Sequence, residues 1–358
     1  MMVKSSMRIG LYSTAMLPSK PVLEKYGGIE VTVGNLAQWL DKQGHEVHLF
    51  AAEGSYEPKN GELHAFDNDV LEEGPERELA MYKSYDKDLL KSMDIIHDNS
   101  HWHFPGVLVP GVPYTFVIHT VRPNIRHFKP EYDYCGVTQC NDMAKFQQWL
   151  CPLRFRTVYS GVNLDAFPYK EEKGDRLLWI SRLFPPKGAE IAIKVAEKSK
   201  TPIDIVGSSS IDVPAYTSKI KRMCNNSKYA TFVGEVSHKE KVEYLQNAKA
   251  LILPIKFMLN ALGEKTEIWS EAFCLTPLEA LSCGTPVIAS PSGVISECVH
   301  DGITGFLAVH EMDFIDKIKR LKEISPEMCR CRAEYFSFDK TAERYLQLYE
   351  EIIEGKTW

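Results

Sequence analysis

The sequence lacks any long run of apolar residues. The apolar stretch that follows Met7 is short and soon reaches Pro18 and Lys20, so it predicts a strand after an irregular end rather than a signal peptide or a membrane span. An excess of positive charge is missing too, because 42 Lys and Arg against 48 Asp and Glu give a net charge of −6. A chain of that charge repels a polyphosphate backbone, so we expect no nucleic-acid partner.

Paired cysteines are also missing. The nine cysteines form an odd set with no C-x-x-C pair, which fits neither a complete disulfide framework nor a zinc ribbon. We therefore expect a reducing, cytoplasmic location. Residues 143–156 (MAKFQQWLCPLRFR) mix aromatic, aliphatic and basic side chains, so peripheral contact with the inner face of a membrane stays open, but an ordinary amphipathic helix is favoured.

Two phosphate-binding fingerprints are absent. Neither G-x-G-x-x-G nor G-x-x-x-x-G-K-[ST] occurs, which weakens the hypotheses of a dehydrogenase and of a P-loop NTPase.

What the sequence does contain is the pattern of two α/β domains. With 358 residues, 44% of them hydrophobic, the chain is long enough for two packed cores. β-branched or aromatic runs alternate with helix-period stretches, which is typical of doubly wound parallel sheets. The predicted strands are residues 8–12, 46–51, 94–97, 114–118, 134–138 and 157–159, then 176–181, 203–206, 230–233, 250–254, 286–289 and 305–308.

The polar stretch 168–175 (PYKEEKGD) interrupts the apolar periodicity and predicts a linker. We therefore expect one Rossmann-like domain over residues 1–168, a second over 169–336, and an amphipathic terminal helix within 337–358 that either packs on the second domain or crosses back to the first. Open sheets bind ligands beyond the carboxyl ends of their strands, so two such domains suit an extended, bipartite ligand.

Two βα loops have side chains or backbone suited to phosphate. Gly27 and Gly28 begin a helix after the first strand, where free N–H groups can approach a phosphate; a plain flexible loop is an equally good interpretation. Arg182 and Lys187 follow the first strand of the second half, and a guanidinium and an ammonium in one loop can hold a pyrophosphate from two sides.

A third candidate is the segment that joins Glu271 to Glu279, with seven residues between them. Thr276, Pro277 and Glu279 match a capping box with Pro at its first helical position, so capping alone could account for Glu279. No such role is open to Glu271, which precedes the predicted helix.

Taken together, these segments resemble the retaining glycosyltransferases of GT-B architecture, in the large family four (glycosyl transferases group 1). The resemblance covers nearly the whole chain and depends on the order and spacing of six short motifs. These motifs are YGGIE, His97-Asp98, the IHT that contains His119, the SR…KG loop, VGEV around Glu235, and E-x7-E with its following SCGTPVIA.

The resemblance implies a role for each matching residue. Arg182 and Lys187 would bind the donor diphosphate and stabilise the leaving nucleotide, Glu279 would accept hydrogen bonds from the ribose, and Glu271 from the donor sugar. His119 would hydrogen-bond the sugar near its anomeric carbon, or else be an ordinary histidine at a strand end. The other implied contacts to the nucleotide sugar are Gly27, Gly28, Glu235, Phe273, Cys274, Leu275 and Thr276.

The resemblance is incomplete at Ala272 and Cys274, where the family usually has Gly, so the identity of the sugar stays open. We expect no essential metal and no cofactor beyond the nucleotide-sugar substrate. The D-x-D at residues 67–69 is better explained as a solvated acidic loop. His97, His101 and His103 lack a convincing fourth ligand and are better explained as a loop that contacts the acceptor.

The sequence thus predicts a metal-independent, retaining hexosyltransferase, with glucose or mannose as the leading sugars and UDP or GDP as the leading nucleotides. Domain closure would exclude water from the donor. The acceptor hydroxyl could belong to a saccharide, a lipid-linked glycan or a small metabolite. A sugar-nucleotide epimerase of the same architecture and a catalytically silent nucleotide- or carbohydrate-binding protein are the two alternatives.

Overall fold

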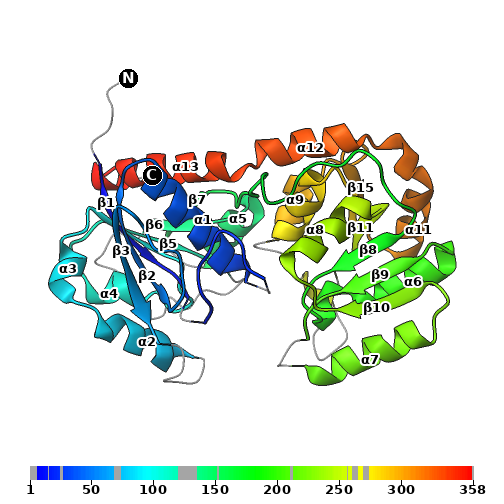
Figure 1. Ribbon diagram of the computed structural model, residues 1–358, viewed down its shortest axis with the longest axis horizontal. Coiled ribbons are helices and arrows are strands. Elements are labelled where there is room, and N and C mark those ends of the chain that lie inside the picture. Colours follow the sequence, from blue (N-terminus) through cyan, green and yellow to red (C-terminus); the bar gives the residue numbers. More distant parts are fainter. Residues whose placement is uncertain are drawn as a thin grey trace. The chain divides into compact units, whose positions relative to one another are not determined.

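The chain folds into two compact units (Figure 1). The computed structural model describes residues 6–14, 16–24, 27–67, 74–119, 135–150, 153–209, 213–255, 257–259, 265–268 and 274–356. The first unit is made within Met1–Leu23, Gly27–Gly161 and Phe338–Trp358, and the second within Glu24–Tyr26 and Val162–Ser337.

The described part of the first unit contains a seven-stranded parallel sheet in the order β3-β2-β1-β4-β5-β6-β7. Its strands are β1 (Arg8–Tyr12), β2 (Glu46–Ala52), β3 (Gly61–Phe66), β4 (Ile95–Asp98), β5 (Tyr114–Val117), β6 (Cys135–Thr138) and β7 (Arg154–Thr157). Its helices are α1 (Gly28–Lys42), α2 (Pro75–Ser84), α3 (Lys87–Lys91), α4 (Phe104–Leu108), α5 (Asn141–Leu150) and α13 (Phe338–Ile353).

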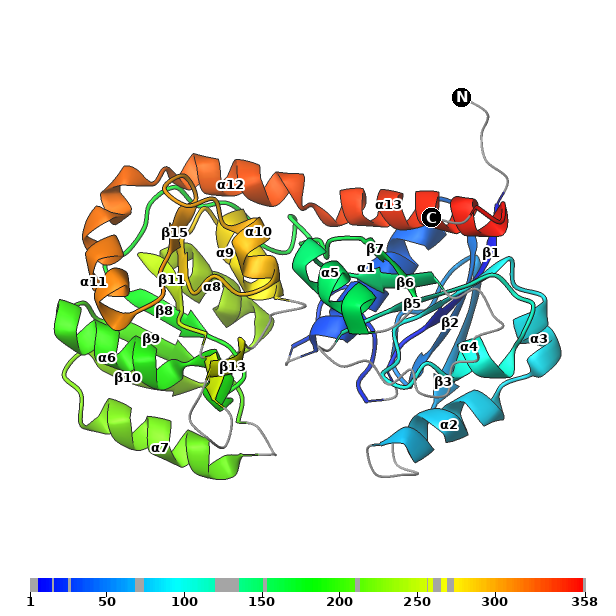
Figure 2. The ribbon, with the colours of Figure 1, turned by 180° about the vertical axis from the view of Figure 1, so that it is seen from behind.

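Both faces of this sheet are covered by helices, because successive strand residues point to opposite sides and the inner strands place buried apolar residues on both. On one face Ile9, Leu11 and Leu49 pack with residues of α1 and α13, so the terminal helix belongs to the first unit. On the other face Phe50, Ile96 and Phe116 pack with residues of α2 and α3. Figures 1 and 2 show α13 along the same side as α1.

The second unit is built around a six-stranded parallel sheet in the order β10-β9-β8-β11-β14-β15. Its strands are β8 (Leu177–Ile180), β9 (Ile203–Val206), β10 (Ala230–Gly234), β11 (Ala250–Leu253), β14 (Val287–Ala289) and β15 (Gly305–Leu307), with a separate antiparallel pair β12 (Phe257–Leu259) and β13 (Lys265–Ile268). Its helices are η1 (Pro185–Lys187), α6 (Ala189–Ser199), α7 (Pro214–Asn225), α8 (His238–Asn247), α9 (Leu275–Ser282), α10 (Val294–Cys298), α11 (Glu311–Arg320), η2 (Leu321–Glu323) and α12 (Pro326–Tyr335).

The prediction of two doubly wound parallel sheets is confirmed, and errors are concentrated at edges. The strand β3 has no counterpart among the predicted strands, and β7 lies at Arg154–Thr157 rather than at 157–159. Both are outer strands of the sheet with several exposed positions, so they lack the continuous apolar run that marks a strand buried on both faces.

The predicted linker 168–175 is wrong as a linker, because this segment is fastened to the second unit. Lys173 Nζ donates to Cys283 O at 2.7 Å and to Gln246 O at 3.1 Å. The backbone N–H of Lys170 also donates to Cys283 O, at 3.1 Å. The chain passes between the units a few residues earlier, after Gly161, and again after Ser337.

Among the residues that the structure describes, we find no helix that combines the length and the apolar character needed to cross a bilayer.

Candidate functional site

The loop between β8 and α6 holds both predicted diphosphate-binding cations. Arg182 and Lys187 lie half-buried in this loop, at the carboxyl edge of the second unit's sheet. The guanidinium of Arg182 lies over the ring of Phe184, 5.2 Å from its centroid. The indole N–H of Trp179, in β8, donates to the backbone oxygen of Lys187 at 3.0 Å, which fixes the end of the loop against the strand.

Two glycines set the backbone geometry of this edge. Gly188 has φ of +71°, and a Cβ at this position would lie 1.9 Å from the carbonyl oxygen of Pro254, which follows β11. A Cβ on Gly207, after β9, would lie 1.8 Å from the carbonyl oxygen of Ser181. Glycine is therefore required at both positions, and the close backbone approach aligns the Arg182–Lys187 loop with the ends of the neighbouring strands.

Glu279 lies in α9, a helix that precedes β14 and so begins at the same edge of the sheet. Its carboxylate is buried, and Oε1 accepts from Lys241 Nζ of α8 at 2.6 Å. Oε2 is also buried and receives no hydrogen bond from any part of the chain that the structure describes.

The predicted capping box is wrong. Helix α9 begins at Leu275, with Cys274 at the N-cap position and no side-chain capping bond, and Glu279 pairs with Lys241 instead. The helix starts before Thr276, so Glu279 is too far along it to reach the N-cap backbone. Capping of the helix therefore does not account for Glu279.

The remaining residues predicted to contact the donor differ in burial, and two of them are not described. Cys274, Leu275 and Thr276 are half-buried at the start of α9, and Glu235 is exposed directly after β10. Glu271 and Phe273 lie outside the described residues, so their roles stay predictions.

In the first unit, α1 begins with two glycines and has a buried carboxylate, that of Glu30, in its first turn. Gly27 is the N-cap residue and Gly28 the first residue of the helix. In the first turn, Glu30 is buried and accepts from Thr14 Oγ1 at 2.5 Å, and burial raises the pKa of Glu30. The loop between β1 and α1 lies directly against the helix, because a Cβ on Gly34 would lie 2.3 Å from the backbone of Lys20.

The His97-Asp98 motif ends β4 and is fully buried. His97 Nδ1 lies 2.5 Å from the hydroxyl of Tyr349 in α13, and burial lowers the pKa of His97 to about 3. Asp98 accepts from the hydroxyl of Tyr114 at 2.7 Å and from the N–H of Ser100 at 2.8 Å. His97 therefore anchors the terminal helix, whereas Asp98 shapes the loop that follows.

That loop is held from its other side by Glu78 of α2. The carboxylate accepts from the backbone N–H of His101 at 3.0 Å and of Trp102 at 2.9 Å. Burial raises the pKa of Glu78 to about 7, and the nearby Asp98 adds to this effect. Sequence reasoning missed Glu78, because its partners lie more than twenty positions away and no motif marks it.

His119 follows β5 at the same carboxyl edge and is half-buried. Its Nδ1 lies 3.2 Å from Nε2 of Gln139, which follows β6. Burial and the neighbouring His101 and His103 lower its pKa well below the ordinary value for histidine. His119 is thus a neutral imidazole at the edge where Asp98 and Glu78 shape the adjoining loop.

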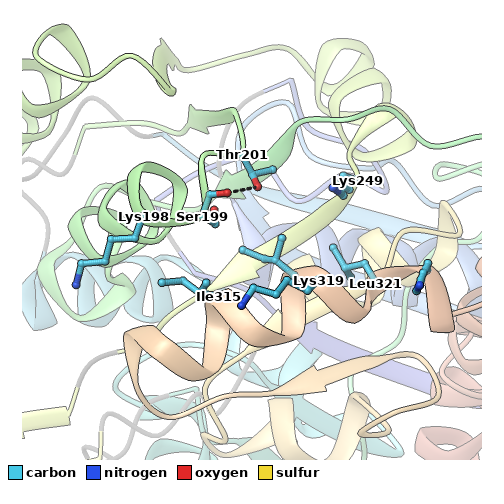
Figure 3. A pocket seen from close by; sticks show the side chains of 9 residues that line it. Lys198, Ser199, Thr201, Lys249, Ile315, Lys319 and Leu321 are labelled. Carbon is cyan, nitrogen blue, oxygen red and sulfur yellow. Dashed lines mark hydrogen bonds between the residues drawn. The ribbon is translucent and has the colours of Figure 1, made fainter.

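The second unit also has a basic pocket at the opposite edge of its sheet (Figure 3). It measures about 410 Å³, and four of the residues that line it are lysines: Lys198, Lys249, Lys319 and Lys322. Lys249 directly precedes β11, which places this pocket at the amino ends of the strands. Open sheets bind their ligands at the carboxyl ends, so the Arg182–Lys187 loop is the better donor candidate.

His97, His101 and His103 do not form a convergent ligand group in the described part of the chain. There, the three side chains whose ligand atoms do converge are His48, Glu62 and His64. Of the D-x-D at 67–69, only Asp67 lies within the described residues.

Comparisons with known proteins agree with this architecture. Residues 26–165 match the model of glycosyltransferase family 4, and residues 164–335 match that of glycosyl transferases group 1. A curated relative is the D-inositol 3-phosphate glycosyltransferase of Mycobacterium tuberculosis, 27% identical over 227 residues. That alignment covers 56% of this chain and 45% of the relative, so the chain matches about half of the relative's length.

Solved structures share the fold over nearly the whole chain. AviGT4, a glycosyltransferase involved in avilamycin A biosynthesis, has a TM-score of 0.74 at 22% identity and covers 98% of this chain and 99% of its own. Sucrose-phosphate synthase from Thermosynechococcus elongatus has a TM-score of 0.71 at 18% identity, covering 98% and 100%. Anabaena HepE, solved in complex with UDP and glucose, has a TM-score of 0.71 at 15% identity, covering 96% and 99%.

The two family models together span residues 26–335, the first over β2 to β7 and the second over β8 to β15. The chain therefore belongs to the group 1, family-4-like glycosyltransferases and has their GT-B architecture.

Proposed function

We propose that this chain is a retaining hexosyltransferase that moves glucose or mannose from a nucleoside diphosphate sugar to an acceptor hydroxyl without a metal ion. The observation that carries the proposal is the carboxylate of Glu279. One of its oxygens is neutralised by Lys241, and the other is buried with no described hydrogen-bond donor. A buried carboxylate oxygen without a donor is costly, and a ribose hydroxyl would supply the missing donor.

The cations at the same edge fit the other half of a nucleoside diphosphate. Arg182 and Lys187 share one βα loop, and their half-buried positions strengthen the attraction to a diphosphate relative to bulk water. They would stabilise the charge that develops when the bond between the anomeric carbon and the phosphate oxygen breaks. The new bond to the acceptor oxygen would form on the same face, and the acceptor proton would pass to the departing phosphate.

The first unit would supply the acceptor side. His119 is kept neutral by its surroundings, so it can accept or donate one hydrogen bond to the sugar without adding charge near the anomeric carbon. Closure of the units on the donor remains part of the proposal. UDP is the first nucleotide to test, because structures of the same fold include complexes with UDP and with UDP-glucose. The family assignment does not favour the epimerase alternative.

The test is thermal unfolding of the chain with UDP, GDP, ADP or NAD, each with and without EDTA. A bound ligand at about 100 times its dissociation constant adds roughly 2.7 kcal/mol to stability. We expect one diphosphate to raise the midpoint regardless of EDTA, and Arg182→Ala/Lys187→Ala to remove that shift.

The matched control is Lys319→Ala/Lys322→Ala, which removes two cations from the basic pocket at the opposite edge of the same sheet. It should keep the shift. A shift only with NAD, or one that both double variants retain, would refute the donor site. If a diphosphate raises the unfolding midpoint but no acceptor makes the chain release nucleotide from a sugar donor, the result would point to the catalytically silent binding protein instead.

A further inference from the structure

Two neighbouring strands of the first unit repeat one short motif. Glu46-Val-His48 lies in β2 and Glu62-Leu-His64 in β3. The strands are parallel, with His48 opposite Glu62 in the register, so the alternation of strand residues puts both glutamates and both histidines on one face. These strands belong to the outer side of the sheet, away from β4 and β5, whose ends carry the candidate acceptor site (Figure 1).

The side chains converge on one point. His48 Nδ1 and His64 Nε2 are 2.9 Å apart, with their ring planes only 16° from parallel. Glu62 Oε2 lies 3.9 Å from His64 Nε2, and one ligand atom from each of the three residues lies within 4.8 Å of the other two. The ring of His48 is buried and that of His64 is half-buried, whereas the side chain of Glu62 is 67% exposed, so the group is open to water on one side.

Further contacts orient the two rings. Glu46 Oε1 lies 2.9 Å from His48 Nε2, so the carboxylate favours the tautomer with its proton on Nε2 and directs the lone pair of Nδ1 toward His64. Arg8 Nε also donates toward His48 Nε2, at 3.3 Å, but it lies closer to the same carboxylate oxygen, at 2.9 Å, so the shorter contacts to the charged carboxylate decide the tautomer. His64 stacks on Phe50, and Tyr85 donates to its backbone oxygen at 3.0 Å.

We propose that His48 Nδ1, His64 Nε2 and the carboxylate of Glu62 bind a divalent transition-metal ion, zinc being the best fit, with water completing the coordination. Imidazole nitrogens favour zinc over magnesium or calcium, which prefer oxygen ligands. A carboxylate on the far nitrogen of a ligating histidine, as Glu46 provides, is the usual second partner at such sites.

The geometry requires only a small adjustment. Tetrahedral coordination at about 2.05 Å puts two nitrogen ligands roughly 3.3 Å apart, so the rings need to separate by about half an ångström. The proton that His64 Nε2 now directs at His48 Nδ1 must leave when the ion enters, and His64 then ligates as the other neutral tautomer, with its proton on Nδ1. The ion would fasten the outer strand β3 to β2, and because it lies in another part of the fold it plays no part in the metal-independent transfer proposed above.

The experiment is a calorimetric titration of the EDTA-treated full chain with zinc chloride. We expect one zinc ion per chain. Glu62→Gln changes a mostly exposed side chain and should weaken binding at least tenfold, and Glu46→Gln should weaken it by about 10- to 100-fold. His64→Gln should abolish it. His300→Gln, which removes an exposed histidine of the second unit, is the control and should leave the affinity unchanged.

A parallel titration with cobalt(II) identifies the ligand type. Absorption bands of nitrogen and oxygen coordination that disappear in Glu62→Gln would support the site. Thiolate charge-transfer absorption would place the metal on cysteines, and an unchanged zinc affinity in both Glu62→Gln and His64→Gln would place it elsewhere; either result overturns the proposal. Absence of stoichiometric binding at micromolar zinc would do the same.

Discussion

The carboxyl edges of the two sheets are held in different ways. In the second unit, the Arg182–Lys187 loop is aligned by main-chain contacts that require Gly188 and Gly207. In the first unit, the loop after β4 is aligned by the buried carboxylates of Asp98 and Glu78, which accept hydrogen bonds from its N–H groups. A backbone contact is insensitive to pH and intolerant of any Cβ, whereas a contact made by a carboxylate responds to protonation.

The largest effect should come from Gly188→Ala. The added Cβ would meet the carbonyl oxygen of Pro254 at 1.9 Å while φ stays near +71°, so we expect a loss of about 4 kcal/mol or more in the free energy of unfolding, measured in urea. Gly302→Ala is the matched control, because φ there is +76° and nothing lies within 4 Å of the new Cβ. It should cost only about 1–2 kcal/mol. Equal losses in the two variants would show that the close approach to Pro254 is unimportant.

This contrast also explains what the sequence could and could not predict. The position of Arg182 and Lys187 at the sheet edge follows from a local βα pattern, and the fold follows from apolar runs in strands such as β8 and β11. The contact of Gly188 with Pro254 and the bonds of Glu78 to residues 101 and 102 join segments far apart in the chain, and no local pattern signals them.

Glu279 illustrates the same limit within one helix. Its local pattern matched a capping box, but the helix starts at Leu275 and a lysine 38 positions away takes the carboxylate. Tertiary pairing overrode the local motif, and only the structure shows that one oxygen of Glu279 is left for a ligand.

The carboxyl edge of the second unit's sheet is also held by one charged contact, the pair of Lys241 and Glu279, in addition to its main-chain contacts. Lys241→Met would leave the buried carboxylate uncompensated, and we expect a loss of about 2–3 kcal/mol in urea unfolding, less than for a fully buried pair because the Lys241 side chain is 28% exposed. Lys241→Met/Glu279→Gln should recover most of this loss but not the UDP shift. If the single and double variants are equally unstable, the ion pair does not stabilise the edge.

The smallest effect concerns Glu78 and changes with pH. Burial raises its pKa to about 7 in the folded chain, against an ordinary value near 4.5 when unfolded. The contribution of this group to stability is therefore fully present below about pH 4.5 and is lost as the pH rises toward 7. Glu78→Gln removes the ionisation and keeps one acceptor oxygen, whereas the carboxylate uses one oxygen for the N–H of His101 and the other for that of Trp102.

We therefore expect the stability of Glu78→Gln relative to the parent protein to rise by about 1–2 kcal/mol between pH 5 and pH 8, as measured by urea unfolding across this range. The control is Glu76→Gln, at an exposed position in the first turn of the same helix. It shows how much of any change comes from losing a negative charge near the helix end rather than from the burial of Glu78. A difference between Glu78→Gln and the parent that stays constant from pH 5 to pH 8 would mean that Glu78 is already ionised when folded. The first unit's edge would then be as insensitive to pH as the glycine-held edge of the second, because only protonation of its buried carboxylates distinguishes the two in this range.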